Sequence, residues 1–174
     1  RGLGSRPRVR VLDDLSTGRR ANRVAAGVEL VVGDIRHRDA VRAAMAGIQA
    51  VFHVAAIPSV VRSWDDPVGS IATNAIGTSI VVEEVERAGV ETVVYSSSFS
   101  IYGDQPTESK SEDLEPSPIS PYVVGKLLGE TVALGRHRPG TLRTPALRYF
   151  NVFGSGRDPG PPHSAVNPPL FGLA

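Results

Sequence analysis

Short apolar runs alternate with longer amphipathic segments along most of this chain. Runs rich in Val and Ile, which are typical of buried strands, occupy Val9–Leu12, Val28–Val32, Ala50–Val54, Thr92–Tyr95 and Ala146–Tyr149. Apolar residues at helical spacing lie between these runs and predict helices at Arg38–Ala46, Pro67–Ala88 and Pro121–Arg136. Regular alternation of strands with helices favours an α/β fold with a parallel sheet covered on both faces.

The helix ends and the loops between the elements also carry signals. Gly89 follows the long middle helix as a C-cap, and Ser120 with Pro121 supplies an N-cap and a first turn. The segment Gly103–Ser120, rich in Glu, Ser and Pro, predicts a surface loop of the kind that often binds ligands, and its alternative is a solvated linker. Seven of the fourteen prolines follow residue 138, so we expect loop or disorder after Tyr149.

Composition narrows the function only slightly. At 174 residues the chain is long enough for one domain with a single core. Its 19 Lys and Arg residues nearly balance its 18 Asp and Glu residues, so charge does not indicate nucleic acid or an anionic membrane as a partner. The lack of cysteine excludes disulfides and cysteine nucleophiles and fits a cytoplasmic setting. No apolar run reaches the length of a membrane span.

Acidic residues follow two of the predicted strands. Asp13 and Asp14 come directly after the first strand, and Asp34 comes after the second. A carboxylate at this point of a dinucleotide-binding fold accepts hydrogen bonds from the adenosine ribose and repels a 2′-phosphate, which favours NAD over NADP. The alternative for each acid is a solvated turn. His53 is predicted to pack in the core, because no other ligand-type residue stands at metal-binding spacing from it.

The strongest chemical signal combines Ser96–Ser98 after the fourth strand, Ile101–Gly103 beyond it, and Tyr122 with Lys126 in the last helix. Residues four apart share a helix face, so Lys126 is expected near the Tyr122 ring. Its ammonium, helped by an oxidised nicotinamide, would lower the pKa of the phenol from about 10 towards neutrality and make it a general base. A Tyr-x-x-x-Lys pair is common by chance, and its alternative is a structural role. The serine-rich strand end before it favours catalysis.

Seven motifs follow one another along nearly the whole chain: Leu12–Gly18, Gly33–Arg36, His53–Ala56, Asn74–Thr78, Ser96–Ser98, Ser120–Lys126 and Leu147–Gly154. In this order they resemble the extended short-chain dehydrogenases of the NAD-dependent epimerase/dehydratase family, in particular UDP-glucose 4-epimerase-like enzymes. The resemblance implies a Rossmann-like, doubly wound parallel sheet.

The resemblance also implies roles for single residues. Ser98 would hydrogen-bond the reacting sugar hydroxyl, Tyr122 would act as acid and base, and Asn151 would contact the phosphates of the nucleotide sugar. Lys126 would hold the nicotinamide ribose and tune Tyr122. The other residues implied to hold NAD are Asp13, Asp14, Ser16, Thr17 and Gly18 at the adenosine ribose, Asp34 and Ile35 at the adenine, Val54, Ala55 and Ala56 at the pyrophosphate and nicotinamide ribose, Asn74 in the interior, and Phe150 at the nicotinamide.

The implied reaction is NAD-dependent epimerisation of a nucleotide sugar, most simply a UDP-sugar. Tyr122 takes the proton of the sugar 4-hydroxyl while the hydride on that carbon passes to NAD, and the 4-keto sugar takes the hydride back on its other face. The related 4,6-dehydratases carry Asp-Glu straight after the equivalent of Ser98, where this chain has Phe99 and Ser100, so dehydration is disfavoured. Pro58, a Lys in some epimerases, leaves the subgroup open. A related dehydratase or reductase and a non-catalytic remnant stay as alternatives, and no pattern predicts a metal site.

The resemblance further implies parts that this sequence does not show. The family begins with a strand, a Gly-x-x-Gly-x-x-Gly turn and a helix, whereas Gly2 and Gly4 precede a strand instead of following one. We therefore expect truncation at both ends, with residues 1–154 as a partial NAD-binding domain and 155–174 as the loop-rich start of a substrate-binding region. That first strand is central in the family's sheet. Its loss predicts two unpaired strand edges and a piece that alone is unstable, binds NAD poorly and is inactive.

Family members often dimerise through the two long helices, here Pro67–Ala88 and Pro121–Arg136. A homodimer is therefore expected of the full-length protein. The alternative is that these helices only cover the sheet.

Overall fold

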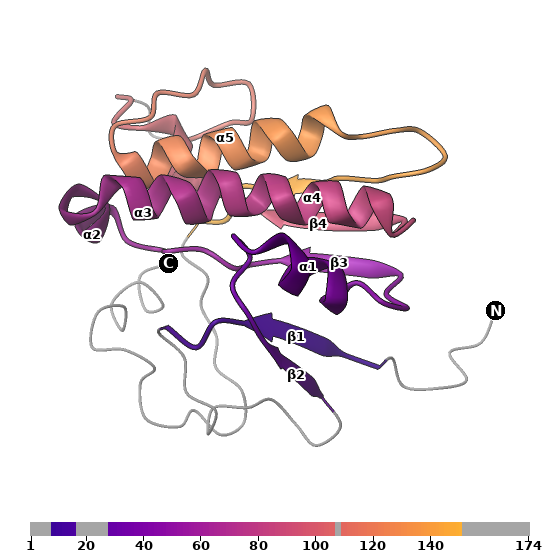
Figure 1. The fold of residues 1–174 in the computed structure, drawn as a ribbon. Helices are drawn as coiled ribbons and strands as arrows, with labels where there is room; N and C mark the ends of the chain where they lie inside the picture. Colours follow the sequence, from indigo (N-terminus) through magenta and orange to yellow (C-terminus); the bar gives the residue numbers. More distant parts are fainter. Residues whose placement is uncertain (1–7, 17–27, 107–108, 151–174) are drawn as a thin grey trace, which may run out of the picture.

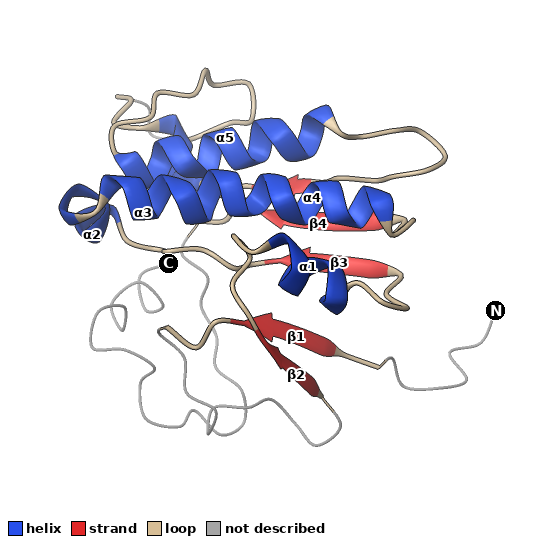
Figure 2. Cartoon of the chain, in the orientation of Figure 1, coloured by secondary structure: helices blue, strands red, loops and turns tan. Residues whose placement is uncertain are grey.

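The computed structural model describes residues 8–16, 28–106 and 109–150. Strands and helices alternate as the apolar pattern predicts, with ends that differ from the predicted ones by two residues at most (Figures 1 and 2). In chain order the elements are β1 (Arg10–Asp13), β2 (Glu29–Val32), α1 (Arg38–Ala44), β3 (Ala50–His53), α2 (Val60–Asp65), α3 (Pro67–Ile71), the π-helix η2 (Ala72–Gly77), α4 (Thr78–Arg87), β4 (Thr92–Ser96), the 3-10 helix η3 (Phe99–Tyr102), α5 (Pro121–Gly135) and β5 (Ala146–Leu147).

The described strands form two parallel sheets. β1 pairs with β2, with Asp13 beside Val32, and β3, β4 and β5 form the second sheet, in which His53 lies beside Tyr95. Figure 1 shows the strands in the order β2, β1, β3, β4, β5, and no described hydrogen-bonded ladder joins β1 to β3.

The helices that contact the strands form one layer (Figure 2). α1 packs on α4, and α4 packs on α5 and β3. The chain crosses from β2 to β3, from β3 to β4 and from β4 to β5 in the same direction along the row of strands. Because such crossover connections are right-handed, their helices lie on the same face of the sheet. Strand side chains alternate to match, with Val93 and Tyr95 buried and Phe52 and Val54 exposed. The described residues thus show one of the two helical layers of a doubly wound sheet.

The middle helix, predicted as one element, contains a π-helical turn. Asp66 caps α3 by accepting a hydrogen bond from the Gly69 amide at 2.9 Å, and Pro67 occupies the first turn. The helix then widens into η2 and tightens again into α4. π-helical turns are rare and often lie at functional sites, and this one carries Asn74.

Helix α2 is an element that the apolar pattern does not predict. Its cap is Ser59, whose hydroxyl accepts a hydrogen bond from the Arg62 amide at 3.1 Å. The buried residue of this helix is Ser63, and Val61 and Trp64 are exposed, so α2 lacks the apolar stripe on which the prediction depends.

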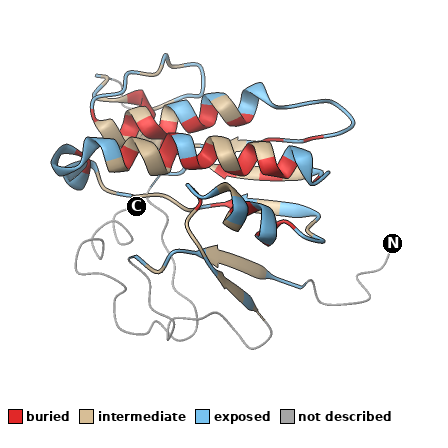
Figure 3. Ribbon diagram, in the orientation of Figure 1, coloured by how far each residue is buried: buried red, intermediate tan, exposed pale blue. Residues whose placement is uncertain are grey.

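The main core lies between the helical layer and both sheets. Val41, Val85 and Val93 are fully buried in it, and Figure 3 shows buried residues gathered along α4 and α5. Leu12 of β1 and Val51 of β3 pack against this same cluster. One core therefore holds the two sheets together.

Helix α5 packs very close to η2. It begins after Ser120 as predicted, and the Ser120 hydroxyl accepts a hydrogen bond from the Val123 amide at 3.3 Å. Two glycines allow the close contact: a Cβ at Gly125 would lie 2.9 Å from Asn74 Cβ, and one at Gly129 would lie 2.8 Å from the Asn74 backbone oxygen. Larger side chains there would push α5 away from the centre of the molecule.

A buried carboxylate joins α1 to α4. Glu84 is 1% exposed, and it forms ion pairs with Arg38 at 2.7 Å, Arg42 at 3.0 Å and Arg87 at 2.7 Å. Hydrogen bonds from Arg42 and Arg38 lower the pKa of Glu84 from its ordinary 4.5 to about 2. The Glu84 carboxylate therefore stays charged in the folded protein at neutral pH.

Glu84→Gln should destabilise the complete protein that carries this chain, because three guanidinium groups lose their shared carboxylate. A lowered carboxyl pKa contributes stability above the ordinary value of 4.5, and this contribution disappears as the pH falls towards about 2. Urea unfolding at successive pH values should show the gap between wild type and variant closing across that window. Glu86→Gln, which removes an exposed partner of Arg136, is the control and should change little. A gap of constant size would contradict this account.

Candidate active site

The candidate site lies where β4 ends and α5 begins. Ser98 follows β4 by two residues and caps η3, and its hydroxyl accepts a hydrogen bond from the Ser100 amide at 3.2 Å. It is buried, at 7% exposed. The carboxyl ends of parallel strands are the ligand-binding edge of open α/β sheets, so the predicted Ser98 stands at the expected edge.

Tyr122 reaches Ser98 from the first turn of α5. Burial raises the pKa of Tyr122 above its ordinary value of 10, and the nearby Ser98 hydroxyl partly offsets the rise. The structure thus brings together two of the three residues predicted to be catalytic. The lowering of the Tyr122 pKa by Lys126 together with an oxidised nicotinamide stays a prediction.

Lys126, one turn further along α5, is buried beneath the strand end. Its ammonium donates a hydrogen bond to the Ser96 carbonyl and lies 4.6 Å from the centre of the Tyr95 ring. The ring that this ammonium contacts is therefore Tyr95, and its expected approach to the Tyr122 ring stays a prediction. Burial lowers the pKa of Lys126 from 10.5 to about 8, and the negative charge of Glu130 opposes this.

Tyr95 also holds the backbone of Lys126. Its hydroxyl donates a hydrogen bond to the Lys126 carbonyl at 3.2 Å, so one side chain contacts both ends of the lysine. No pattern in the sequence assigns Tyr95 this place, because it depends on how α5 crosses β4.

Asn74 of η2 anchors the segment that follows β3. Its Oδ1 accepts a hydrogen bond from the Ile57 amide at 2.9 Å, and its Nδ2 donates one to the Ile57 carbonyl at 3.3 Å. Asn74 is 1% exposed, whereas Val54 in the anchored segment is 70% exposed. Ala55 packs against the core and Ala56 is half-buried. The backbone directly after the predicted cofactor residues Val54–Ala56 is thus held by Asn74, and Val54 is open to solvent.

His53 is a core residue, as the sequence predicts. It is buried, and its Nε2 lies 2.9 Å from the Thr78 hydroxyl, which itself donates to the Asn74 carbonyl at 2.7 Å. Nε2 is therefore assigned the proton. Burial lowers the pKa of His53 to about 3, so the ring is neutral at physiological pH.

The acids after β1 and β2 lie in local turns. Asp13 accepts a hydrogen bond from the Leu15 amide at 2.6 Å, and Asp14 accepts one from Ser16 at 2.9 Å. Both carboxylates are exposed and keep free acceptor sites. Asp34 pairs with Arg36 at 2.6 Å, which lowers its pKa. The Ile35 side chain lies in the core, so only its backbone is available to a cofactor.

Phe150 is exposed and stacks on Phe99, with ring centres 4.8 Å apart. This places an aromatic platform beside the strand end that leads to Ser98. The remaining predicted residues, Thr17, Gly18 and Asn151, and the predicted start of a substrate-binding region at 155–174, lie outside the described residues.

Glu130 and Arg148 are charged residues at this site that the sequence patterns did not single out. They form an ion pair at 2.7 Å, with Glu130 3% exposed. The sequence feature that could have identified Glu130 is its position four residues after Lys126, because this spacing puts both side chains on one helix face.

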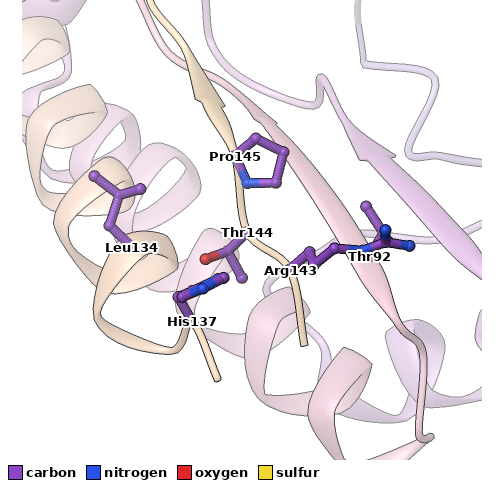
Figure 4. Close-up of a pocket in the computed structure, with 6 residues that line it drawn as sticks. All are labelled: Thr92, Leu134, His137, Arg143, Thr144 and Pro145. Atoms are coloured by element: carbon purple, nitrogen blue, oxygen red, sulfur yellow. The ribbon is translucent and has the colours of Figure 1, made fainter. Parts of the chain in front are cut away.

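A hollow of about 610 Å³ lies elsewhere, beside the start of β4 and the end of α5 (Figure 4). Its lining residues are Thr92, Leu134, His137, Arg143, Thr144 and Pro145. None of them belongs to the candidate site. Within the described ranges there is no cluster of three or more metal-ligand side chains, and no helix has the length and apolar character to cross a membrane.

Comparison with known proteins identifies the family. The profile described as the NAD dependent epimerase/dehydratase family matches residues 2–168, so the chain belongs to this family. The UDP-glucose 4-epimerase of Mycolicibacterium smegmatis is 38% identical over 159 residues, which are 85% of this chain and 49% of that protein. The chain spans about half the length of such curated relatives.

Solved structures give the same answer for the fold. The UDP-glucose 4-epimerase of Thermus thermophilus in complex with NAD has a TM-score of 0.78 at 34% identity, covering 89% of this chain and 51% of that one. The dTDP-glucose 4,6-dehydratase of Streptomyces venezuelae with NAD bound has a TM-score of 0.78 at 32% identity, covering 84% and 47%. The predicted Rossmann-like fold and the expected NAD dependence of the family are confirmed. Epimerases and dehydratases are both similar, so family membership does not choose the reaction.

Asn74→Ala should loosen the segment after β3, because both backbone groups of Ile57 lose their buried partner. A loss of about 1–3 kcal/mol in unfolding free energy is expected. Hydrogen exchange of the Ile57 amide in the complete protein is the direct measurement, and it should become faster. Ser79→Ala, which removes a hydroxyl bonded within its own helix, is the control. Unchanged protection of Ile57 in Asn74→Ala would refute the anchoring role.

Proposed function

We propose that this chain belongs to an NAD-dependent enzyme that epimerises a nucleotide sugar at C4, with a UDP-sugar as substrate. The observation that carries the proposal is the approach of Tyr122 to Ser98 at the carboxyl end of β4, with the Lys126 ammonium one turn along the same helix. A hydroxyl donor, a phenol and a buried cation in this order suit proton transfer at a sugar hydroxyl.

The residues present fit NAD. The Lys126 ammonium has a carbonyl and a ring as neighbours and keeps donor capacity for ribose hydroxyls. Asp13 and Asp14 keep exposed acceptor sites after β1 for the adenosine ribose, and Phe150 offers an aromatic face to the nicotinamide. When bound, NAD supplies the hydride acceptor and a positive ring charge.

Tyr122 is the group that takes and returns the proton of the sugar 4-hydroxyl. In the chain without bound NAD, burial raises the pKa of Tyr122, so the phenol stays protonated. A positive charge close to the phenol would lower this pKa. Ser98 holds the sugar oxygen and the Tyr122 oxygen together. If the 4-keto sugar turns over in the site, Tyr122 would return the proton to O4 while the reduced cofactor would supply the hydride to C4 on the other face, which would invert C4.

Dehydration is the second candidate reaction, because a 4,6-dehydratase is among the similar structures. The positions that hold its acid pair are Phe99 and Ser100 in this chain. The Phe99 ring stacks on Phe150, and the Ser100 amide donates to Ser98. Neither side chain moves protons at neutral pH, which favours epimerisation. The intact Ser98, Tyr122 and Lys126 argue against a non-catalytic remnant.

The wider expectations also remain proposals. Residues 1–154 would form part of an NAD-binding domain and 155–174 the start of a substrate-binding region. Exposed Val68, Ile76 and Leu134 on the two long helices Pro67–Ala88 and Pro121–Arg136 support a homodimer through these helices. The lack of cysteine suits a cytoplasmic enzyme.

Tyr122→Phe in the complete protein should lower UDP-glucose and UDP-galactose interconversion by at least about 100-fold, because the proton-transfer group is removed. NAD binding should persist. Tyr149→Phe changes an exposed tyrosine and serves as the matched control. Full activity in Tyr122→Phe would contradict the assignment, and a wild type that binds NAD without this activity would point to another sugar or to the neighbouring reaction.

A further inference from the structure

One charged pair borders the candidate site without belonging to the predicted set. The Arg148 guanidinium donates to Glu130 through Nη2 at 2.7 Å and through Nε at 3.1 Å. Its Nη1 donates to the Tyr102 hydroxyl at 2.9 Å. Glu130 also accepts a hydrogen bond from the Ser97 hydroxyl. All three guanidinium nitrogens and both carboxylate oxygens are therefore engaged.

The contacts of this pair join the parts that carry the reacting groups. Glu130 lies on α5, one turn after Lys126 and two turns after Tyr122. Ser97 directly precedes Ser98, and Arg148 follows β5. The Ser97 amide also donates to the Leu147 carbonyl at 2.8 Å. The pair thus links α5, the end of β4 and the end of β5 through charged hydrogen bonds.

We propose that Glu130 and Arg148 form a positioning unit for the Ser98, Tyr122 and Lys126 centre. The unit fixes the strand end that carries Ser98 against the helix that carries Tyr122, and it places a carboxylate one helical turn from the buried Lys126. This inference rests on the proposed function for its effect on turnover, but its electrostatic part does not.

The electrostatic part follows from what surrounds Lys126. His53 of β3 is neutral, and Tyr95 of β4 and Tyr122 of α5 are both uncharged phenols at neutral pH. Glu130 is the anionic side chain that acts on the lysine, and its charge raises the pKa that burial lowers to about 8. Without that charge the ammonium would lose its proton at a lower pH.

If Glu130 and Arg148 had a purely structural role, a different result would be expected. Removing one member of a buried ion pair destabilises a protein in either case, because the other charge is left unpaired. Only a unit that acts through Lys126 also moves the titration of Lys126. The two roles are therefore separated by the lysine pKa and not by stability.

The experiment uses lysine-selective ¹³C NMR of the complete protein, with the Lys126 signal identified by its loss in Lys126→Arg. Glu130→Gln should shift the pKa of Lys126 downwards from about 8. It should also lower kcat for UDP-sugar interconversion by up to about 100-fold through misplacement of Ser98. Glu86→Gln removes an exposed carboxylate from α4 and should leave both readings unchanged.

The double variant Glu130→Gln, Arg148→Met covers the case in which the single variant does not fold, because it leaves no unpaired guanidinium. It should still shift the Lys126 pKa downwards, by less than the single variant does, because the Arg148 charge is removed together with the carboxylate. An unshifted Lys126 titration, with only a lower unfolding midpoint, would overturn the proposal. Absence of sugar conversion in the wild type would overturn the proposed function alone, since the lysine titration needs no turnover.

Discussion

The close approach of α5 to η2 and β4 is the constraint on which the rest of the site depends. Gly125 and Gly129 lack the Cβ atoms that would collide with Asn74. Helix α5 therefore packs close enough to η2 and β4 to bury the charged side chain of Lys126. Burying an ammonium is costly unless it is hydrogen-bonded and paired. The Ser96 carbonyl, the Tyr95 ring and the nearby Glu130 supply that compensation.

The same close approach orders the neighbouring groups. Because α5 is fixed against β4, its first turn brings Tyr122 to Ser98, and its third turn brings Glu130 to Ser97. Asn74, beneath the two glycines, turns its side chain to the segment after β3. One packing contact thus sets the pair proposed for proton transfer and the segment expected to hold the cofactor.

The sequence predicted the parts of this arrangement that follow from local pattern. Val and Ile runs located the strands, and the Ser120 cap located the start of α5, because these signals depend on neighbouring residues alone. The π-helical turn at Ala72–Gly77 was missed because its residues fit an ordinary helix. The contact of Lys126 with Tyr95 and the Glu130 to Arg148 pair were missed because they depend on how elements far apart in the chain cross. Phe150 stacking on Phe99 belongs to the same class of contact.

The central claim is that Ser98 and Tyr122 act together on one hydroxyl of a nucleotide sugar. A crystal structure of the complete protein with NAD and a UDP-sugar tests it most directly. The account predicts that both side-chain oxygens lie within about 2.6–3.2 Å of the same sugar hydroxyl, with Lys126 Nζ on the nicotinamide ribose. A sugar whose reacting hydroxyl is held by other residues, with Tyr122 bonded only to Ser98, would contradict it.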